Sequence, residues 1–452
     1  MPRRFLRASI ALLDNDDELS PDALFEVVKA LNEDREVDFL YSDEDKIAED
    51  GTYCDHYFKP DWSPDHLHSV MYLLHLLVFQ KDIFYEAGGF RTDYSGAQDY
   101  DLSLRLSRKS KKIHHIAKIL YHWRKIASSA ASAVDAKPEA LSAAGEALAS
   151  HIRDSAIEAD VLPGKFMGSF RVKHRIGGSP RVTLCITTND GDADVPERGG
   201  STLSHFVRSI VERTDYSNYE LLIVDNRNLS AATRKNLADV EYRLVSYTGS
   251  QKPFNFARKA NFAFSQIRTE HLVLLNDDLE VIGPEWLSAL LEFSQQKQIG
   301  AVGGKLLFPD DTIQHAGVVL GVNGSAAHVY HKYPRDFIGY NGFTHLIRNY
   351  SAVTGACMAT RREVIERTGG FDEKLALDFN DIAFCLAALQ RGYRNVYTPY
   401  CELYHFESVT AKRTSQDPGE LEHFLRVWSR FVERDPYYNP NLTRYGADFS
   451  AG

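Results

Sequence analysis

The chain has 452 residues, 44% of them apolar and 25% charged, which is room for two or three soluble domains of ordinary size. Its formal net charge of −10 does not favour nucleic acid as a partner, and a diphosphate ligand would need local cations or a metal ion. The five cysteines are scattered without a C-x-x-C pair, as in reduced thiols used for packing. No signal peptide is visible, so we expect a cytoplasmic protein.

The first 130 residues are predicted to be part of an α/β domain. A strand-like run, Ala8 to Leu13, ends in the acidic cluster 14–17, and Ser20 and Pro21 begin a helix. A second strand, Val37 to Tyr41, ends in Ser42-Asp-Glu-Asp45. The apolar positions of the helix are spaced for one face: Leu24, Val27, Val28 and Leu31.

Residues 131–179 are predicted to form a helical connector. The composition shifts there to Ala, Ser and Glu, and Pro138 to Ala159 is a good helix former. Gly177-Gly-Ser-Pro180 marks a boundary. We therefore expect a domain over 1–130, this connector, a second domain over 180–434 and a tail over 435–452.

The second domain has a full alternating β/α pattern. Strands are predicted at Val182 to Thr187, Leu221 to Val224 and Arg243 to Tyr247, with helical spacing between them. Alternation of this kind indicates a parallel sheet with helices on its faces.

The stretch His271 to Glu280 is the most informative in this domain. Leu272 to Leu275 is a continuous apolar run, typical of a strand buried on both faces. Asn276, Asp277 and Asp278 follow it at the end of the strand, where ligands bind in open α/β sheets. Adjacent acids there suit Mg²⁺ or Mn²⁺ together with substrate phosphates. The alternative is that they only turn the chain and cap the next helix.

The spacing of these features repeats. Gly88-Gly-Phe90 recurs as Gly369-Gly-Phe371, and the acidic cluster at Asp14 and Asp16 matches Asn276 and Asp278. Asp99 precedes His122 by 23 residues, and Asp381 precedes His405 by 24. The first copy lacks nearly a hundred residues of β/α pattern that precede Asp278 in the second. The chain therefore holds one complete and one partial copy of a domain.

These motifs resemble the family 2 glycosyltransferases of the GT-A fold, in particular tandem-domain bacterial enzymes of O-antigen and rhamnose-containing polysaccharide synthesis. The resemblance implies an α/β fold with a mostly parallel sheet flanked by helices, and a first domain truncated at its N-terminus. The pieces that carry it in the second copy are Leu222-Ile-Val-Asp-Asn226, Leu274-Leu-Asn-Asp-Asp278, Gly369-Gly-Phe-Asp372 and Phe379-Asn-Asp381. In the first copy they are Ser42-Asp-Glu-Asp45, Phe58-Lys-Pro-Asp-Trp-Ser-Pro64 and Gln98-Asp-Tyr-Asp101.

The resemblance also implies roles for particular residues. Asp381 would be the base that deprotonates the acceptor hydroxyl, and Asp278 and His405 would hold a divalent metal, Mg²⁺ or Mn²⁺. The residues implied in donor binding are Thr188, Asp225, Asn226 and Asp277. The first copy keeps a partial or vestigial site, which we expect not to bind a nucleotide by itself: Asp14, Asp16, Asp99 and His122.

Each of these residues also has a structural explanation. Asp381 could cap a helix, His405 could be a core histidine, and Asp225 could be a turn residue. His315 and His328 are expected to be structural, and the stripe Phe254, Phe256, Phe262 and Phe264 is expected to be core. The second copy departs from the family at Ala383 and Ala387, where the first copy has Asp101 and Arg105.

The expected function is transfer of a sugar from a nucleotide-diphospho-sugar to a growing cell-surface saccharide, or to a lipid-linked one, with inversion in a single displacement. A peripheral place at the inner face of the cell membrane is compatible with that acceptor. The alternative is a catalytically silent saccharide-binding or scaffold subunit of the same fold. A nucleotidyltransferase would need a glycine- and lysine-rich phosphate loop, and Thr187 to Asp192 does not provide one.

Overall fold

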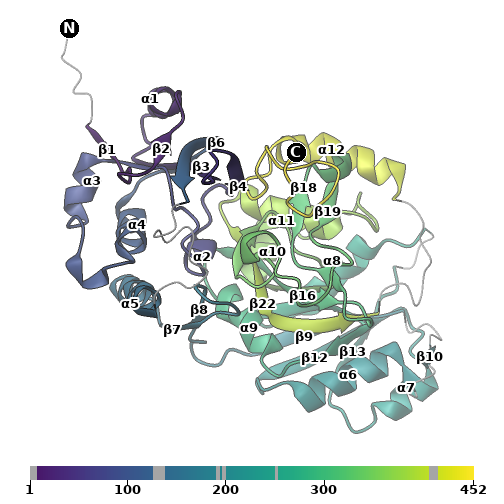
Figure 1. Cartoon of the computed structure of the whole chain (residues 1–452). Coiled ribbons are helices and arrows are strands. Elements are labelled where there is room, and N and C mark those ends of the chain that lie inside the picture. Colours follow the sequence, from purple (N-terminus) through teal and green to yellow (C-terminus); the bar gives the residue numbers. More distant parts are fainter. Residues whose placement is uncertain (1–7, 126–137, 190–193, 196–199, 250–252, 407–415) are drawn as a thin grey trace. The chain divides into compact units, whose positions relative to one another are not determined.

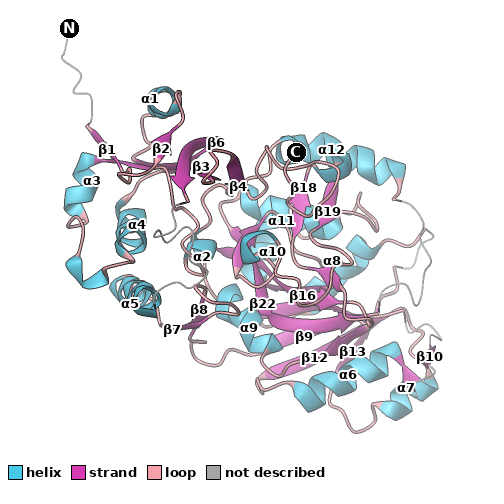
Figure 2. Cartoon of the chain, in the orientation of Figure 1, coloured by secondary structure: helices cyan, strands magenta, loops and turns pink. Residues whose placement is uncertain are grey.

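The computed structural model describes residues 8–125, 138–189, 194–195, 200–249, 253–406 and 416–452 (Figure 1). The chain divides into two compact units. The first comprises residues 1–174, 436–442 and 451–452, and the second comprises 175–435 and 443–450, so each includes part of the C-terminal segment. Both units are built from helices and strands (Figure 2). Across the described helices, no stretch combines the length and apolarity that crossing a membrane requires.

The first unit contains a six-stranded sheet with the order β1-β5-β3-β6-β2, and β4 pairs with β3. The helix predicted from Pro138 to Ala159 ends at Asp154, and an antiparallel hairpin of β7 and β8 follows it. The elements are β1 (Ser9–Ala11), β2 (Glu18–Leu19), α1 (Ala23–Glu33), β3 (Phe39–Ile47), β4 (Tyr53–Tyr57), α2 (Pro64–Leu67), β5 (Leu77–Gln80), α3 (Lys81–Glu86), η1 (Thr92–Tyr94), α4 (Gln98–Lys109), β6 (Ile113–Arg124), α5 (Pro138–Asp154), β7 (Ala159–Pro163) and β8 (Phe170–His174).

The second unit contains a ten-stranded sheet with the order β13-β12-β9-β14-β21-β16-β22-β15. Strand β17 pairs with β16 and β20 with β22. The elements are β9 (Val182–Thr187), β10 (Asp194–Val195), β11 (Gly200–Ser201), α6 (Thr202–Arg213), β12 (Tyr219–Asp225), α7 (Ala231–Asn236), β13 (Arg243–Ser246), α8 (Phe256–Gln266), β14 (His271–Asn276), β15 (Leu279–Val281), α9 (Trp286–Ser294), β16 (Ile299–Leu307), β17 (Ile313–His315), β18 (Val318–Leu320), η2 (Val322–Gly324), β19 (Ala326–His328), η3 (Tyr340–Gly342), β20 (Arg348–Tyr350), β21 (Cys357–Arg361), α10 (Arg362–Thr368), α11 (Asn380–Gln390), β22 (Arg394–His405) and α12 (Pro418–Glu433).

The internal repeat appears in the strand pairing. The antiparallel pairs β14–β21, β15–β22 and β16–β17 correspond to β1–β5, β2–β6 and β3–β4, and the parallel pair β16–β22 corresponds to β3–β6. The second unit adds three parallel strands, β9, β12 and β13, beyond β14. Parallel pairing is therefore concentrated in this added part, and the rest of each sheet is mixed. The hydrophobic periodicity of a strand does not specify its direction, so the sequence did not predict the antiparallel pairs.

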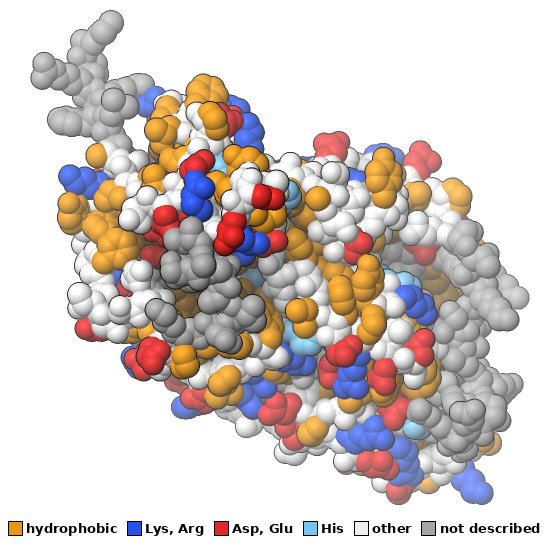
Figure 3. Space-filling model, viewed as in Figure 1, with side chains coloured by type: hydrophobic (Ala, Val, Ile, Leu, Met, Phe, Trp, Pro, Cys, Tyr) orange, Lys and Arg blue, Asp and Glu red, His pale blue; other side chains and the backbone are white. Residues whose placement is uncertain are grey.

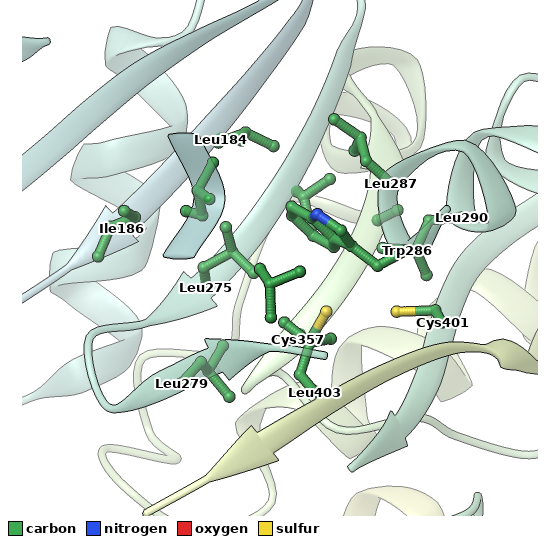
Figure 4. Packing of buried hydrophobic residues seen from close by; sticks show 14 of the residues in the cluster. Leu184, Ile186, Leu275, Leu279, Trp286, Leu287, Leu290, Cys357, Cys401 and Leu403 are labelled. Carbon is green, nitrogen blue, oxygen red and sulfur yellow. The ribbon is translucent and has the colours of Figure 1, made fainter. Parts of the chain in front are cut away.

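The core of the second unit is built around β14, which is buried on both faces as its apolar run predicts. Val273 and Leu275 join a cluster with β9, α6 and α9, while Leu274 joins the cluster on the opposite face. Figure 4 shows side chains of α9, led by Trp286, packed beside Leu275. Burial on both faces fixes the position of β14 along its neighbouring strands. The polar residues after Leu275 therefore lie at the edge formed by the carboxyl ends of the parallel strands.

Helix α1 buries a different face from the one its sequence predicts. Val27 is buried together with two alanines, whereas Leu24 and Val28 are 62% and 55% exposed. The equivalent helix of the second unit, α9, is almost completely buried because it shares a core with β9 and α6. The described part of the first unit has no counterpart of β9 or α6, so apolar side chains remain on the surface over α1, orange in Figure 3.

The acidic stretch after Tyr41 does not end a strand, as its sequence suggested, but lies within β3 with its carboxylates buried. Asp43 accepts a hydrogen bond from the Lys59 backbone amide at 2.8 Å and contacts His115 Nε2 at 2.8 Å. The Asn439 amide nitrogen, far away in the sequence, lies 3.0 and 2.9 Å from the two oxygens of Asp43. These hydrogen bonds offset the free-energy cost of burying the Asp43 carboxylate. The sequence of β3 alone does not reveal the partners, because they lie elsewhere in the chain.

Glu44 in the same strand makes the first unit sensitive to acid. Burial alone would raise its pKa, but the Lys59 ammonium, 3.1 Å away, and His75 outweigh this and lower the pKa to about 2. The same burial lowers the pKa of Lys59, so the pair stabilises less than the Glu44 shift alone suggests. The ordinary pKa of a glutamate is 4.5, and a carboxylate whose pKa is lowered on folding contributes its full stabilisation at pH values above that. This contribution is lost as the pH falls towards 2.

We therefore expect hydrogen-exchange protection of the β3 amides to fall as the pH drops from about 4.5 towards 2, after correction for intrinsic exchange. In a Glu44→Gln protein, which has no carboxylate to titrate there, this dependence should be weaker. Equal acid sensitivity in both proteins would show that other groups control it.

Candidate active site

The candidate site lies at the carboxyl ends of the parallel strands β9, β12 and β14. The strand register places Thr187 beside both Val224 and Asn276, so the residues that follow these three meet at one edge of the sheet. These residues are Thr188, Asp225 and Asp277. Residues 190–193, which follow Asn189 in the sequence, lie outside the described residues.

Asp225 is completely buried, and one of its carboxylate oxygens is unpaired among the described residues. The Leu229 amide donates to Oδ2 at 3.2 Å, whereas Oδ1 has no hydrogen-bond partner among the described residues. Burial alone would raise the pKa of Asp225, but hydrogen bonds from Ser246 and from backbone amides hold it below its ordinary value. The neighbouring Asn226 donates to Asn189 Oδ1 at 2.8 Å, and within the described structure its own Oδ1 is also unpaired. Two buried acceptors suit N–H or O–H groups of a ligand.

Asp277 is held by the strand-end residue of β9. The Thr188 hydroxyl donates to Asp277 Oδ2, which ties the ends of β9 and β14 together. Burial raises the pKa of Asp277 to about 6; the Thr188 hydrogen bond opposes this effect and the charge of Asp278 adds to it. Asp277 therefore remains mostly ionised at neutral pH.

Lys259 is a site residue that the sequence reading missed. It lies on the buried face of α8, and its Nζ donates to the Thr188 carbonyl at 2.5 Å. Burial lowers the pKa of Lys259 to about 8, against the opposing charges of Asp277 and Asp225. Its ammonium partly balances these two acids. A lysine on the apolar face of a helix was the available signal. The phenylalanine stripe at and before the same helix, which was expected to be core, is only partly buried, with Phe254 41% exposed.

Asp278 and His405 are brought together by the pairing of β15 with β22. Leu279 lies opposite His405, which places His405 Nε2 3.2 Å from Asp278 Oδ1. His405 is buried, and its Nδ1 has no hydrogen-bond partner in the described part of the chain. No group of three or more His, Cys, Asp or Glu side chains among the described residues could hold a metal unaided. One carboxylate and one imidazole nevertheless fit a divalent ion whose other ligands come from substrate phosphates and water.

Asp381 lies in the first turn of α11, but it does not cap that helix, because Phe379 occupies the N-cap position. Its Oδ2 accepts a hydrogen bond from Gly355 N at 2.7 Å, and its Oδ1 accepts one from Ile382 N at 2.8 Å. Burial raises the pKa of Asp381 although these hydrogen bonds lower it, and a raised pKa favours a proton acceptor. Gly355 precedes Ala356, whose carbonyl accepts the Asn276 amide at 3.0 Å, so one loop connects Asp381 to the acid cluster.

The two departures from the family correspond to an ion pair in the first unit. There Asp101 is bound by Arg105, which also donates to the Ala87 carbonyl. In the second unit Ala383 is buried and Ala387 packs partly against the same apolar cluster. The acid and the arginine are thus structural where they occur, and the two alanines replace an ion pair by apolar packing.

The first unit uses its equivalent residues differently. His122 contacts Asp45 through Nδ1 at 2.5 Å, whereas the corresponding Nδ1 of His405 is unpaired within the described residues. Glu18 lies opposite His122 as Leu279 lies opposite His405, so it is Asp17 that takes the position of Asp278.

Asp17 is occupied structurally, because it accepts hydrogen bonds from the Tyr121 hydroxyl and the Arg124 amide. Of the acids expected in this partial site, Asp14 is exposed and Asp16 and Asp99 are partly exposed. Burial raises the pKa of Asp99, and the charge of Asp14 adds to this effect.

Comparison with known proteins matches residues 180–420 to the model of the family described as "Glycosyltransferase like family 2". The chain is 41% identical over 454 residues to "Uncharacterized protein y4gI" of Sinorhizobium fredii, a match covering 98% of this chain and 49% of that protein. It is 37% identical over 447 residues to "O-antigen biosynthesis protein RfbC" of Myxococcus xanthus, covering 97% of this chain and 34% of that protein. The chain thus spans half or less of the length of these relatives.

Among solved structures, GalNAc-T7 with UDP, GalNAc and Mn²⁺ matches with a TM-score of 0.43 and 14% identity, over 55% of this chain and 48% of that one. The mannosyltransferase PcManGT from Pyrobaculum calidifontis, with GDP-Man and Mn²⁺, matches with a TM-score of 0.36 and 17% identity, over 66% of this chain and 81% of that one.

Proposed function

The chain belongs to glycosyltransferase-like family 2, and from that premise we propose that its second unit transfers a sugar from a nucleotide-diphospho-sugar to a saccharide hydroxyl. The observation that carries this proposal is the convergence of Asp225, Asp277 and Asp278 at the ends of two strands of one sheet, with His405 beside them. The unpaired Oδ1 of Asp225 suits the base or ribose of the donor, and Thr188, Asn226 and Asp277 complete that side.

Asp278 and His405 would hold Mg²⁺ or Mn²⁺, which offsets the charge that develops on the diphosphate as it leaves. Asp381 takes the proton from the acceptor hydroxyl. The hydroxyl oxygen forms its bond to the anomeric carbon while the bond from that carbon to the diphosphate oxygen breaks. The bonding electrons leave with the diphosphate. One displacement with one base inverts the configuration at the anomeric carbon.

We propose a growing cell-surface polysaccharide, free or lipid-linked, as the acceptor. The support is the 37% identity to a protein named for O-antigen biosynthesis. Such an acceptor would place the protein at the inner face of the membrane as a peripheral component.

The test is a screen of UDP-, GDP-, dTDP- and CMP-linked sugars for nucleotide release, with and without Mn²⁺ or Mg²⁺. We expect one donor class to be hydrolysed slowly without an acceptor, since water can replace the acceptor hydroxyl. This activity should be lost on metal chelation and restored by adding metal. Absence of turnover with every donor, combined with binding of oligosaccharides, would instead favour a silent saccharide-binding subunit. Undiminished release in the presence of a chelator would contradict the metal assignment.

A further inference from the structure

A short loop before β21 holds Asp381 by its backbone. Three successive amides of this loop point to three different acceptors. The Gly355 amide donates to Asp381 Oδ2 at 2.7 Å, and the Ala356 amide donates to Thr354 Oγ1 at 3.3 Å. The Thr354 amide lies 3.5 Å from His315 Nε2. The Thr354 side chain also forms a hydrogen bond with Asp381, and this bond lowers the pKa of the Asp381 carboxyl. The direction of the carboxylate therefore depends on where this loop sits.

His315 contacts this loop through the Thr354 amide, and His328 contacts His315. His315 at the end of β17 is completely buried, and its Nδ1 lies 2.9 Å from Nδ1 of His328, at the end of β19. Burial lowers the pKa of His315 well below its ordinary value and that of His328 to about 4, so both rings are neutral at neutral pH.

The contacts define the tautomers of both rings. An amide N–H can only donate, so His315 Nε2, facing Thr354 N, is the unprotonated nitrogen. In a neutral ring Nδ1 then carries the proton and donates it to His328 Nδ1. Loss of the acceptor on His328 would leave the buried Nδ1–H of His315 unpaired. It would also favour the other tautomer, whose Nε2–H cannot accept from Thr354.

We propose that His315 and His328 are positioning residues for Asp381, acting through the amides of Thr354 and Gly355. The inference rests on the proposed function, in which Asp381 is the base. The histidines would touch neither donor nor acceptor. They would keep the loop in the position from which the Gly355 amide orients the Asp381 carboxylate. Gly355 packs closely against Asp381, since a Cβ added to Gly355 would lie 3.0 Å from the Cβ of Asp381.

The test compares His328→Phe, which keeps an aromatic ring without an acceptor, with His328→Asn, whose amide can replace Nδ1. We expect His328→Phe to lower kcat about tenfold to a hundredfold, because displacement of a catalytic group by a fraction of an ångström to 1 Å has effects of this order. The KM for the donor, and calorimetric binding of UDP, GDP and dTDP with Mn²⁺, should remain unchanged. His328→Asn should recover most of kcat.

His331→Asn is the matched control, since His331 follows three residues later and packs edge-on against Phe308. It should behave as the unaltered protein. If His328→Phe does not fold, His328→Ala takes its place. An unchanged kcat in the folded variant, an equal loss of nucleotide binding, or a His328→Asn protein as impaired as His328→Phe would overturn the inference. Asp381→Asn, assayed in parallel, separates the two hypotheses: if it retains full transfer the proposed base is wrong, and if it alone loses transfer only the positioning role fails.

Discussion

Replacement of Asp381 by Asn is expected to abolish sugar transfer while leaving donor binding intact. The amide keeps the shape of the side chain, and its single oxygen can still accept one of the two hydrogen bonds, from Gly355 or from Ile382, but the amide cannot take a proton. We expect kcat to fall by about 10²- to 10⁴-fold, the usual contribution of a positioned base. Calorimetric titration with the active donor and Mn²⁺ should give the same dissociation constant as the unaltered protein.

The matched control is Asp372→Asn, because Asp372 precedes the same helix and contacts His423 at 2.7 Å rather than the loop at Gly355. It should retain transfer. If Asp381→Asn lost donor binding together with transfer, Asp381 would be a donor-binding or structural residue and the base would have to be sought elsewhere.

Replacement of Asp278 by Ala is expected to remove metal-dependent nucleotide release without unfolding the protein. The side chain is partly exposed at the sheet edge and supports no described strand pairing, so its loss should cost little stability. The metal ion would stabilise the charge that develops in the transition state by several kcal/mol. Loss of Asp278, one of its ligands, should therefore slow turnover by roughly a hundredfold or more. The apparent Mn²⁺ requirement should also rise steeply in a metal titration.

Asp16→Ala, which removes an acid from the first unit, is the natural comparison for Asp278→Ala. It should leave turnover and the metal requirement as they are, since we place the reaction in the second unit. Full metal-dependent turnover in a folded Asp278→Ala protein would instead remove Asp278 from the metal site.

The sequence allowed the strand-end acids to be predicted because their position depends on local pattern. An apolar run that stops at Asp277 and Asp278 identifies both a strand and its end. The repeated spacing to His122 and His405 indicated an internal duplication, which the strand pairings now show. Strand direction and the burial of Asp43 could not be read in this way. The burial of Asp43 depends on partners remote in sequence, such as His115 and Asn439. Strand direction depends on how segments far apart in sequence pair, which the local apolar pattern does not specify.

Helix faces were predicted less well than strand ends. The exposed Leu24 of α1 and the buried Lys259 of α8 both violate the rule that apolar residues face the core. Leu24 is exposed, and the described first unit has no counterpart of β9 and α6, which share a core with α9 in the second unit. Lys259 is buried beside Asp277 and Asp225, whose charges offset part of the cost of desolvating its ammonium, and its Nζ also donates to the Thr188 carbonyl.

The contact of Asn439 with Asp43 means that the first unit includes a segment synthesised much later than the rest of it. The two residues are 396 positions apart, which at about 5–20 residues per second is on the order of 20–80 s of translation. Throughout that time Asp43 is without a donor that it has in the finished molecule, at a cost of about 1–3 kcal/mol for each buried group left unsatisfied. The first unit can therefore be completed only after the stretch 436–442, which belongs to it, has been synthesised.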